Sequence, residues 1–179
     1  MKTYTLTVAG VTRDLPVCPV NEHLDIAGFV MLGDIELTTA CAAELAKRAP
    51  EHDVIITAEA KGIPVVQEMA RILGDKYFVC CRKGFKLYMQ EPVSVDVKSI
   101  TTEARQKLWI DECDAKRMRG KRVLVVDDVI STGESLAAIE KLVTEVGGNV
   151  CGRMCVLAEG DAKDRDDIIY LEELPLFFK

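Results

Sequence analysis

Residues 123–135 constrain the fold of this chain more than any other stretch. Four apolar residues in succession, at positions 123–126, are typical of a strand that is buried on both faces of a parallel sheet. Two carboxylates, Asp127 and Asp128, follow where such a strand ends, and we call them the acidic pair. A short loop rich in hydroxyl groups comes next, and helical spacing of apolar residues then begins at Leu136.

The loop between this strand and helix predicts a binding site for a phosphorylated sugar. Its backbone N–H groups can bind a phosphate, and the start of a helix adds a favourable dipole. The residues expected in this phosphate loop are Val129, Ile130, Ser131, Thr132, Gly133, Glu134 and Ser135. The acidic pair would repel a phosphate, so it suits sugar hydroxyl groups or a hydrated Mg²⁺ held between sugar and protein. Both carboxylates are expected at a solvent-facing strand end.

The same stretch resembles the PRPP-binding signature of type I phosphoribosyltransferases. That signature is an apolar strand, two acidic residues, two spacers and then Ser/Thr-Thr-Gly-x-Ser/Thr, and every position is filled here. An ordinary strand-to-helix turn with solvated Asp and Ser caps is the alternative. The resemblance implies a pentosyltransferase that uses PRPP as co-substrate with Mg²⁺ bound through PRPP near the acidic pair, and with Asp127 and Asp128 as catalytic residues.

Two basic turns resemble pyrophosphate-binding segments of adenine phosphoribosyltransferases. Glu59-Ala60-Lys61-Gly62 is similar to a Glu-x-Arg-Gly turn, with a lysine where arginine is usual, so the charge is kept but bidentate geometry is lost. Arg82-Lys83-Gly84-Phe85-Lys86-Leu87 is similar to an Arg-Lys-x-x-Lys-Leu segment. The resemblance implies pyrophosphate contacts from Ala60, Lys61, Arg82, Lys83 and Lys86. Solvated basic turns are the alternative reading of both.

The resemblance also implies a mobile loop and a hood over the base. In that loop the family usually carries a Glu-Tyr-Gly-like run, whose Glu assists proton transfer. Glu103 is the nearest carboxylate here and is assigned as catalytic acid/base, although the Tyr-Gly partners are absent. In the hood, expected from residues 23–29, Phe29 either stacks on a purine or packs in the core. Glu159 either lies near the purine pocket or caps a charged turn.

Strands that alternate with helices predict an α/β fold with a parallel sheet flanked by helices and right-handed crossovers. The strands are expected at residues 53–57, 76–80, 123–126, 150–157 and 168–170, the helices at 34–49, 63–74 and 136–146, and an N-terminal hairpin at 4–17. Residues 88–112 are expected to form one or two extended strands in a mobile excursion. Residues 1–179 are expected to form a single phosphoribosyltransferase domain.

Composition narrows the classes of partner. The net charge of −6 argues against nucleic acid or an anionic membrane as the main partner. The seven cysteines are odd in number and include no Cys-x-x-Cys pair, which predicts reduced thiols rather than disulfides or zinc. No signal-peptide core follows Met1 and no apolar run reaches membrane length, so a cytoplasmic location is expected.

These features together predict a purine phosphoribosyltransferase of purine salvage. It would transfer the 5-phosphoribosyl group from PRPP to a purine base, with adenine as the expected base, and release pyrophosphate. A homodimer is expected by analogy with the family. Transfer to xanthine or another base is an alternative, and so is a regulator without catalysis that senses PRPP or a nucleotide. Turnover of PRPP with one base would separate an enzyme from a sensor.

Overall fold

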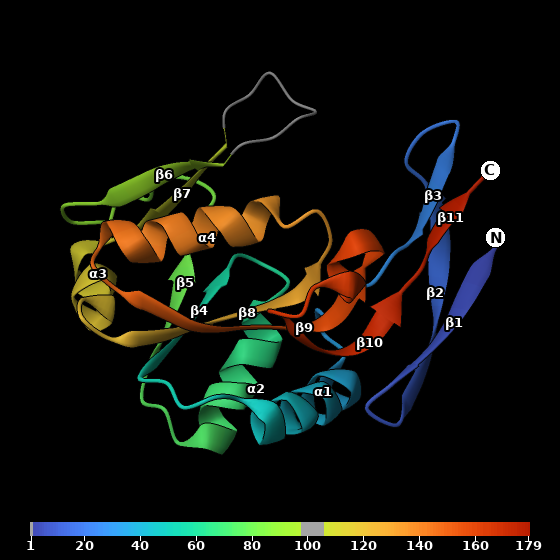
Figure 1. Ribbon diagram of the computed structural model, residues 1–179, viewed down its shortest axis with the longest axis horizontal. Coiled ribbons are helices and arrows are strands. Elements are labelled where there is room, and N and C mark those ends of the chain that lie inside the picture. The colour runs from blue at the N-terminus through green and yellow to red at the C-terminus, as the bar shows by residue number, and fades with distance from the viewer. Residues whose placement is uncertain (1, 98–105) are drawn as a thin grey trace.

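The computed structural model describes residues 2–97 and 106–179 and has a five-stranded parallel sheet at its centre (Figure 1). The strand order is β10-β9-β8-β4-β5, and each neighbouring pair is parallel. The strands are β4 (Val54–Ala58), β5 (Phe78–Cys81), β8 (Arg122–Ile130), β9 (Asn149–Glu159) and β10 (Ile169–Leu174). This sheet and its alternation with helices confirm the predicted α/β fold class.

Helices cover both faces of the sheet. In Figure 1, α1 (Ile35–Arg48) and α2 (Ile63–Leu73) lie on one face and α4 (Glu134–Glu145) lies on the other. A short helix, α3 (Glu112–Met118), was not predicted from the sequence; its first turn is capped by the Asp111 side chain. Within residues 2–97 and 106–179, no helix has the length and apolar character that crossing a membrane requires.

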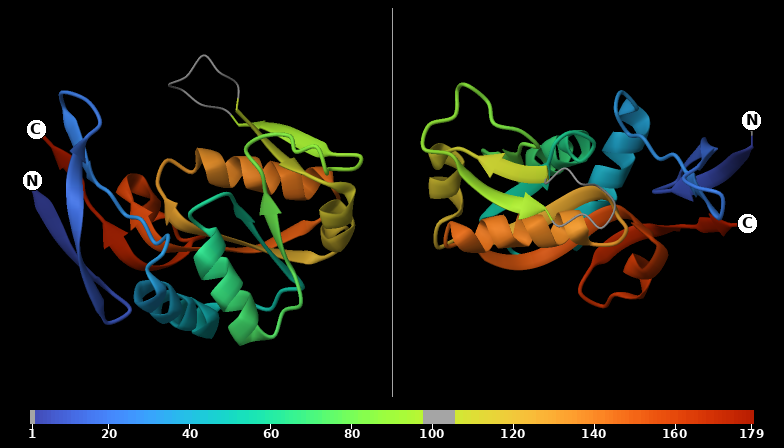
Figure 2. Two further views of the ribbon diagram at one scale, coloured as in Figure 1. Left: turned by 180° about the vertical axis from the view of Figure 1, so that it is seen from behind. Right: turned by 90° about the horizontal axis from the view of Figure 1, so that it is seen from above.

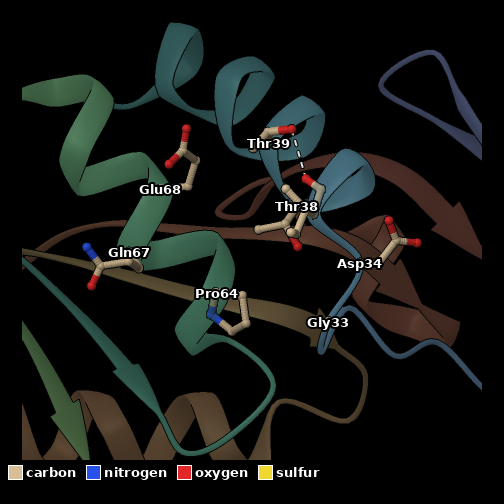
Figure 3. Close-up of a pocket in the computed structure, with 8 residues that line it drawn as sticks. Gly33, Asp34, Thr38, Thr39, Pro64, Gln67 and Glu68 are labelled. Atoms are coloured by element: carbon tan, nitrogen blue, oxygen red, sulfur yellow. Dashed lines mark hydrogen bonds between the residues drawn. The ribbon is translucent and has the colours of Figure 1, made fainter.

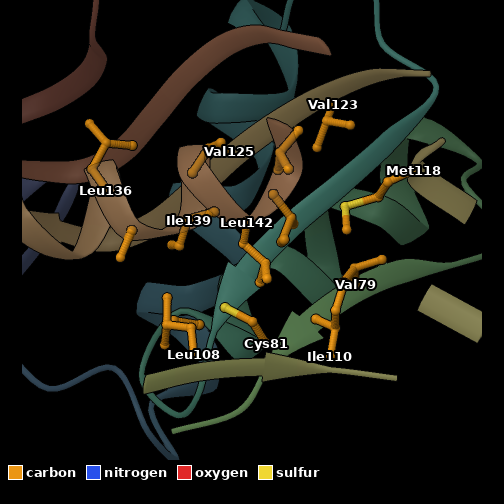
Figure 4. Close-up of a cluster of buried hydrophobic side chains, with 14 of the residues drawn as sticks. Val79, Cys81, Leu108, Ile110, Met118, Val123, Val125, Leu136, Ile139 and Leu142 are labelled. Carbon is orange, nitrogen blue, oxygen red and sulfur yellow. The ribbon is translucent and has the colours of Figure 1, made fainter. Parts of the chain in front are cut away.

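The central strand β8 is buried on both faces, as its run of apolar residues predicts. Val123 and Val125 belong to the core beneath α4 (Figure 4), whereas Leu124 and Val126 belong to the core beneath α1 and α2. All four side chains are fully buried. Because burial of each such side chain contributes about 1.5–3 kcal/mol, these residues hold β8 at the centre of the sheet. They thereby fix where the acidic pair emerges.

A second, four-stranded sheet lies at one end of the molecule, in the order β1-β2-β3-β11. Its strands are β1 (Thr3–Val8), β2 (Val11–Pro19), β3 (Leu24–Ala27) and β11 (Leu176–Phe178). The antiparallel pairing of β1 with β2 confirms the predicted hairpin. The pairing of β3 with β11 was not predicted, and it brings the C-terminal segment beside the N-terminal hairpin (Figure 2). Of this sheet, β3 contains four of the residues 23–29 from which a hood over the base was expected.

The excursion after β5 contains the antiparallel strands β6 (Val93–Val97) and β7 (Gln106–Ile110), so the expectation of extended strands is confirmed. The pair lies above α4 in Figure 1, and Val95, Leu108 and Ile110 join the core that α4 covers. The excursion is therefore docked on the domain through its apolar side chains. Residues 98–105, which include Glu103, lie outside the described residues.

Candidate functional site

Three turns meet at the carboxyl edge of the parallel sheet. They comprise residues 59–62 after β4, residues 82–87 after β5 and residues 127–135 at the end of β8. Since β4 lies between β8 and β5 and all three are parallel, their carboxyl ends lie at one edge. This is the edge at which ligands bind on open parallel sheets. The sheet therefore brings together the phosphate loop and both basic turns.

The two side chains of the acidic pair differ in exposure. Asp127 is half-buried, whereas Asp128 is only 4% exposed. The backbone N–H of Asp128 donates a hydrogen bond to Asp127 Oδ1 at 2.9 Å, which orients the first carboxylate. The expectation that both carboxylates face solvent is wrong for Asp128, because its side chain is buried where the turn after β4 packs against the end of β8.

Lys61 forms an ion pair with the acidic pair. Its Nζ lies 3.0 Å from Asp128 Oδ2, and its side chain is 47% exposed. A buried carboxylate without a counter-charge would be strongly destabilising, so this ammonium group has a structural as well as a chemical consequence. The residue expected to bind pyrophosphate thus contacts the residue expected to bind ribose.

Burial raises the pKa of Asp127 above its ordinary value, and the negative charge of the adjacent Asp128 raises it further. The ammonium group of Lys61 lowers the pKa of Asp127, but its effect is smaller than that of burial and of Asp128. The acidic pair is therefore an electrostatically strained arrangement. A cation or a set of hydroxyl donors bound between the two carboxylates would offset their mutual repulsion.

Gly62 allows the turn after β4 to lie against the end of β8. A Cβ atom at Gly62 would be 2.3 Å from Thr57 Oγ1 and 2.9 Å from Asp127 Oδ1, distances that no side chain tolerates. Thr57 is fully buried at the end of β4, and sequence reasoning did not identify it as part of the site. The sequence did offer one signal for Thr57: it is a hydroxyl residue near the end of a strand that leads into a predicted ligand-binding turn. The glycine of the Glu-Ala-Lys-Gly turn is thus required by the close approach of β4 and β8.

Glu59 connects the two basic turns, and sequence reasoning gave it no role of its own. Its Oε1 accepts a hydrogen bond from the backbone N–H of Lys83 at 2.6 Å, and its Oε2 lies 2.9 Å from Arg82 Nε. Arg82 also exchanges two backbone hydrogen bonds with Trp109 of β7, each 2.8 Å long. The guanidinium group of Arg82 is thus held by Glu59 beside the cis peptide bond that joins Glu59 to Ala60.

The remainder of the second basic turn packs on β7. The rings of Phe85 and Trp109 meet edge to face with their centroids 5.8 Å apart. Lys83 is exposed and Lys86 is half-buried in the same turn. Both cations therefore lie in a segment that is anchored through Arg82, Phe85 and Glu59.

The phosphate loop encloses a small cavity of about 110 Å³. Its lining consists of Asp127, Val129, Ile130, Ser131, Thr132, Gly133, Glu134, Ser135 and Leu136, which include all of the residues expected in the phosphate loop. Gly133 has a φ of +81° at the N-terminal cap of α4 and has no side chain with which to cap the helix. The N–H of Glu134 donates a long hydrogen bond of 3.5 Å to Thr132 Oγ1. Among the described residues, the N–H groups of Ser135 and Leu136 have no side-chain acceptor, so they can bind an anion.

The residues expected near the base are not gathered in one pocket. Phe29 is 4% exposed and belongs to the core between the second sheet and α1, so it packs as a core residue rather than presenting its ring to a ligand. Glu159 is half-buried at the end of β9 and precedes the 3₁₀ helix η1 (Gly160–Asp164). It shares the carboxyl edge of the sheet with the acidic pair. Glu103 lies outside the described residues.

A separate pocket of about 270 Å³ lies between the first turns of α1 and α2 (Figure 3). Its lining includes Asp34, Thr38 and Pro64. None of the residues that the sequence assigned to the site lines this pocket. The predicted chemistry is therefore concentrated at the carboxyl edge of the sheet and not between these helices.

The acidic pair can hold a divalent cation through a bound substrate. Mg²⁺ in phosphate-handling sites usually takes one or two protein carboxylates together with substrate phosphates and water. Asp127 and Asp128 supply such carboxylates, and no described group of three His, Cys, Asp or Glu side chains forms a complete metal site. Two adjacent carboxylates are a donor set that fits a cation bound jointly by protein and substrate.

Comparison with models of known protein families gives a match that covers most of the chain. Residues 31–174 match the model of the phosphoribosyl transferase domain. The matched segment contains the phosphate loop, the acidic pair and both basic turns. It ends in β10.

The sequence relatives are named as hypoxanthine/guanine phosphoribosyltransferases. The chain is 32% identical over 111 residues to a hypoxanthine/guanine phosphoribosyltransferase of Methanotorris igneus, which is 62% of this chain and 56% of that protein. A protein of the same name from Methanocella arvoryzae is 26% identical over 163 residues, which is 91% of this chain and 78% of that protein. For three such relatives, this chain spans only 55–56% of the length of the relative.

The solved structures with this fold are named as adenine phosphoribosyltransferases. The adenine phosphoribosyltransferase of Thermoanaerobacter pseudethanolicus superposes with a TM-score of 0.73 at 25% identity, covering 89% of this chain and 95% of that chain. The adenine phosphoribosyltransferase of Saccharomyces cerevisiae superposes with a TM-score of 0.67 at 23% identity, covering 88% and 92%. The second likeness concerns the fold alone. The two kinds of comparison therefore differ in the purine that they name.

Proposed function

Since the chain belongs to the phosphoribosyl transferase domain family, we propose that it transfers the 5-phosphoribosyl group from PRPP to a purine base and releases pyrophosphate. One observation carries the proposal: the acidic pair, the phosphate-loop cavity and Lys61 lie together at the carboxyl edge of the sheet. Each of these parts suits a different portion of PRPP.

The phosphate loop and the acidic pair would fix the sugar. Backbone N–H groups at the start of α4 would bind the 5-phosphate, while Asp127 and Asp128 would accept hydrogen bonds from the ribose hydroxyls. The anomeric carbon gains positive charge as pyrophosphate departs, and carboxylates held nearby stabilise that charge. Both effects depend on the sugar being held in one orientation.

Cations at the two basic turns would stabilise the departing pyrophosphate. Lys61 is close enough to the acidic pair to reach a group bound beside it, and Glu59 holds the guanidinium group of Arg82 at the same edge. Mg²⁺ bound through PRPP supplies additional positive charge to the pyrophosphate. Lys83 and Lys86 extend the basic surface along the second turn.

Lys61→Ala is expected to weaken pyrophosphate binding and to slow transfer. Loss of one charge-assisted contact costs about 1.5–3 kcal/mol, which corresponds to a 10- to 150-fold weaker Kd. Calorimetry of pyrophosphate binding with Mg²⁺ measures the change. Lys47→Ala is the control, because that lysine also pairs with a carboxylate, Glu44, but lies on α1 away from the site. Equal pyrophosphate affinity in Lys61→Ala and the parent would contradict the assignment.

The purine itself is the finer part of the proposal. Adenine is favoured by the resemblance of the two basic turns to adenine phosphoribosyltransferases. Hypoxanthine and guanine form the second candidate, which the sequence relatives favour. Base-dependent release of pyrophosphate from PRPP, measured with adenine, hypoxanthine, guanine, xanthine and orotate, tests both at once. Adenine turnover alone supports the first candidate, and turnover of the 6-oxopurines alone supports the second.

The regulator without catalysis remains the alternative to an enzyme. A parent protein that binds PRPP with Mg²⁺ but releases no pyrophosphate with any base of the panel would favour it. The single domain over residues 1–179, the homodimer, the cytoplasmic location and the acid/base role of Glu103 remain predictions.

A further inference from the structure

The segment that forms the phosphate loop carries negative side chains but no positive ones. Residues 123–135 contain Asp127, Asp128 and Glu134, and no lysine or arginine. A sugar phosphate that binds there carries nearly two negative charges at neutral pH. Backbone N–H groups and the dipole of α4 attract it, while the carboxylates repel it. A cation from elsewhere in the chain would correct this balance.

Arg165 places a guanidinium group against the glycine of the loop. A Cβ atom on Gly133 would be 3.0 Å from Arg165 Nη1, and no other described atom outside the chain neighbours of Gly133 comes within 4 Å of that point. Arg165 follows η1 in the connection between β9 and β10, about thirty residues beyond the loop in sequence. The sequence suggested only a charged turn for this connection.

The guanidinium group of Arg165 is held in a fixed orientation. Its Nε and Nη2 donate hydrogen bonds of 2.9 Å and 2.8 Å to the two carboxylate oxygens of Asp167. This two-point contact fixes the guanidinium plane and leaves Nη1 on the side of Gly133. The backbone N–H of Arg165 donates to the carbonyl of Ala162, which is buried and anchors η1. The turn is therefore built to hold this side chain beside the loop.

We propose that Arg165 is a positioning residue for the phosphate of the phosphoribosyl group. It acts through Gly133: it covers the outer side of the glycine turn and adds positive charge next to a loop whose own side chains are acidic. Arg165 does not line the phosphate-loop cavity, so it acts through the electric field and through the loop rather than by direct contact. This inference rests on the proposed function, because it assumes that the loop binds a sugar phosphate.

Ribose 5-phosphate binding to the full chain tests the inference, since this probe carries the phosphate without pyrophosphate. Arg165→Gln is expected to weaken its binding roughly three- to fivefold at low salt, the effect of one partly exposed charge. The difference should shrink at high salt, because screening removes the contribution of exposed charges. Arg165→Lys should restore most of the affinity, and pyrophosphate binding should stay at the parent value in both variants.

Two matched variants separate charge from structure. Arg153→Gln is the control, because Arg153 pairs with Glu140 and lies 3.5 Å from Asp167, yet Gly133 has no contact with it. It should bind ribose 5-phosphate like the parent. Asp167→Asn removes the carboxylate that offsets Arg165 but keeps a hydrogen-bond acceptor for it. It should bind more tightly than the parent, whereas a purely structural role predicts weaker binding.

The outcomes distinguish this inference from the proposed function. A parent protein that does not bind ribose 5-phosphate contradicts both. A parent that binds it, with Arg165→Gln equally tight at low salt, contradicts the role of Arg165 alone. Equal losses in Arg165→Gln and Arg153→Gln that do not depend on salt would also overturn it. If Arg165→Gln does not fold, weaker or unchanged binding by Asp167→Asn overturns the inference and tighter binding supports it.

Discussion

The double variant Asp127→Asn/Asp128→Asn is expected to lower kcat by about 100-fold or more, the typical effect of removing an electrostatic contact made to the transition state. The amides keep the shape of the carboxylates and can still bind ribose hydroxyls, so PRPP affinity should change less than the rate does. Only the stabilisation of the positively charged sugar is lost, and an interaction that strengthens in the transition state appears in kcat as well as in kcat/KM. Steady-state kinetics with the accepted base measure both quantities.

This variant should remain folded, because its amides can keep the local contacts of the acidic pair. The Asn side-chain oxygen at position 127 can accept the backbone N–H that now donates to Asp127 Oδ1. Lys61 loses its partner, but that side chain is half-exposed and can be solvated. Circular dichroism and thermal unfolding provide the control. A folded double variant with parent kcat would contradict the role of the acidic pair in catalysis.

The raised pKa of Asp127 also makes the acidic pair a source of instability. Between the unfolded and the folded pKa of Asp127, the folded protein binds more protons than the unfolded chain. The free energy of unfolding therefore falls as pH rises through that interval, and the loss is complete above the folded pKa. The single variant Asp127→Asn should accordingly be more stable than the parent at alkaline pH. Its advantage should disappear below the ordinary aspartate pKa, where neither state is charged.

Stability and activity thus oppose each other at this position. Asp127→Asn is expected to stabilise the fold and to impair the transfer, as is common where a site holds unfavourable charge for its chemistry. Thermal unfolding of the parent and of Asp127→Asn across pH measures the first effect. Equal stability of the two proteins at every pH would show that the fold does not destabilise this carboxylate.

The central strand and the phosphate loop were predictable because their signals are local. The apolar run of β8 is typical of a strand buried on both faces, and the acidic pair and glycine loop follow it directly in sequence. The cap of α1 was predictable for the same reason: Asp34 accepts a hydrogen bond from the N–H of Leu37, which is three residues away. Patterns of this kind depend on the neighbours of a residue in sequence, which are fixed before folding.

The features that were missed depend on segments far apart in sequence. The strand β11 exists only because β3 lies beside it, and β3 is too short to carry a clear alternation of its own. The ion pair of Lys61 with the buried Asp128 joins residues of two different turns. Arg165 likewise has no mark in the sequence that associates it with Gly133. Packing decides these contacts, and periodicity does not encode them.

Gly133→Val is expected to weaken PRPP binding by about 100-fold while leaving the chain folded, if two of the loop's charge-assisted contacts are lost. Gly133 has a φ of +81°, a backbone conformation that β-branched residues strongly avoid. The loop would have to change its backbone conformation to accommodate valine, and its N–H groups would then no longer converge on the phosphate. The added side chain would also meet Arg165 Nη1, 3.0 Å from its Cβ.

The strain itself costs about 1–3 kcal/mol, less than the total stability of a typical domain. Gly74→Val is the matched control, because Gly74 has a φ of +79° at the end of α2 and no atom within 4 Å of a Cβ built there. It should lose comparable stability and yet bind PRPP like the parent, since it lies outside the three turns of the site. Calorimetry with PRPP and Mg²⁺, paired with thermal unfolding, measures both properties. Parent affinity in a folded Gly133→Val would exclude the loop as the phosphate site, and an equal loss in Gly74→Val would attribute the effect to strain alone.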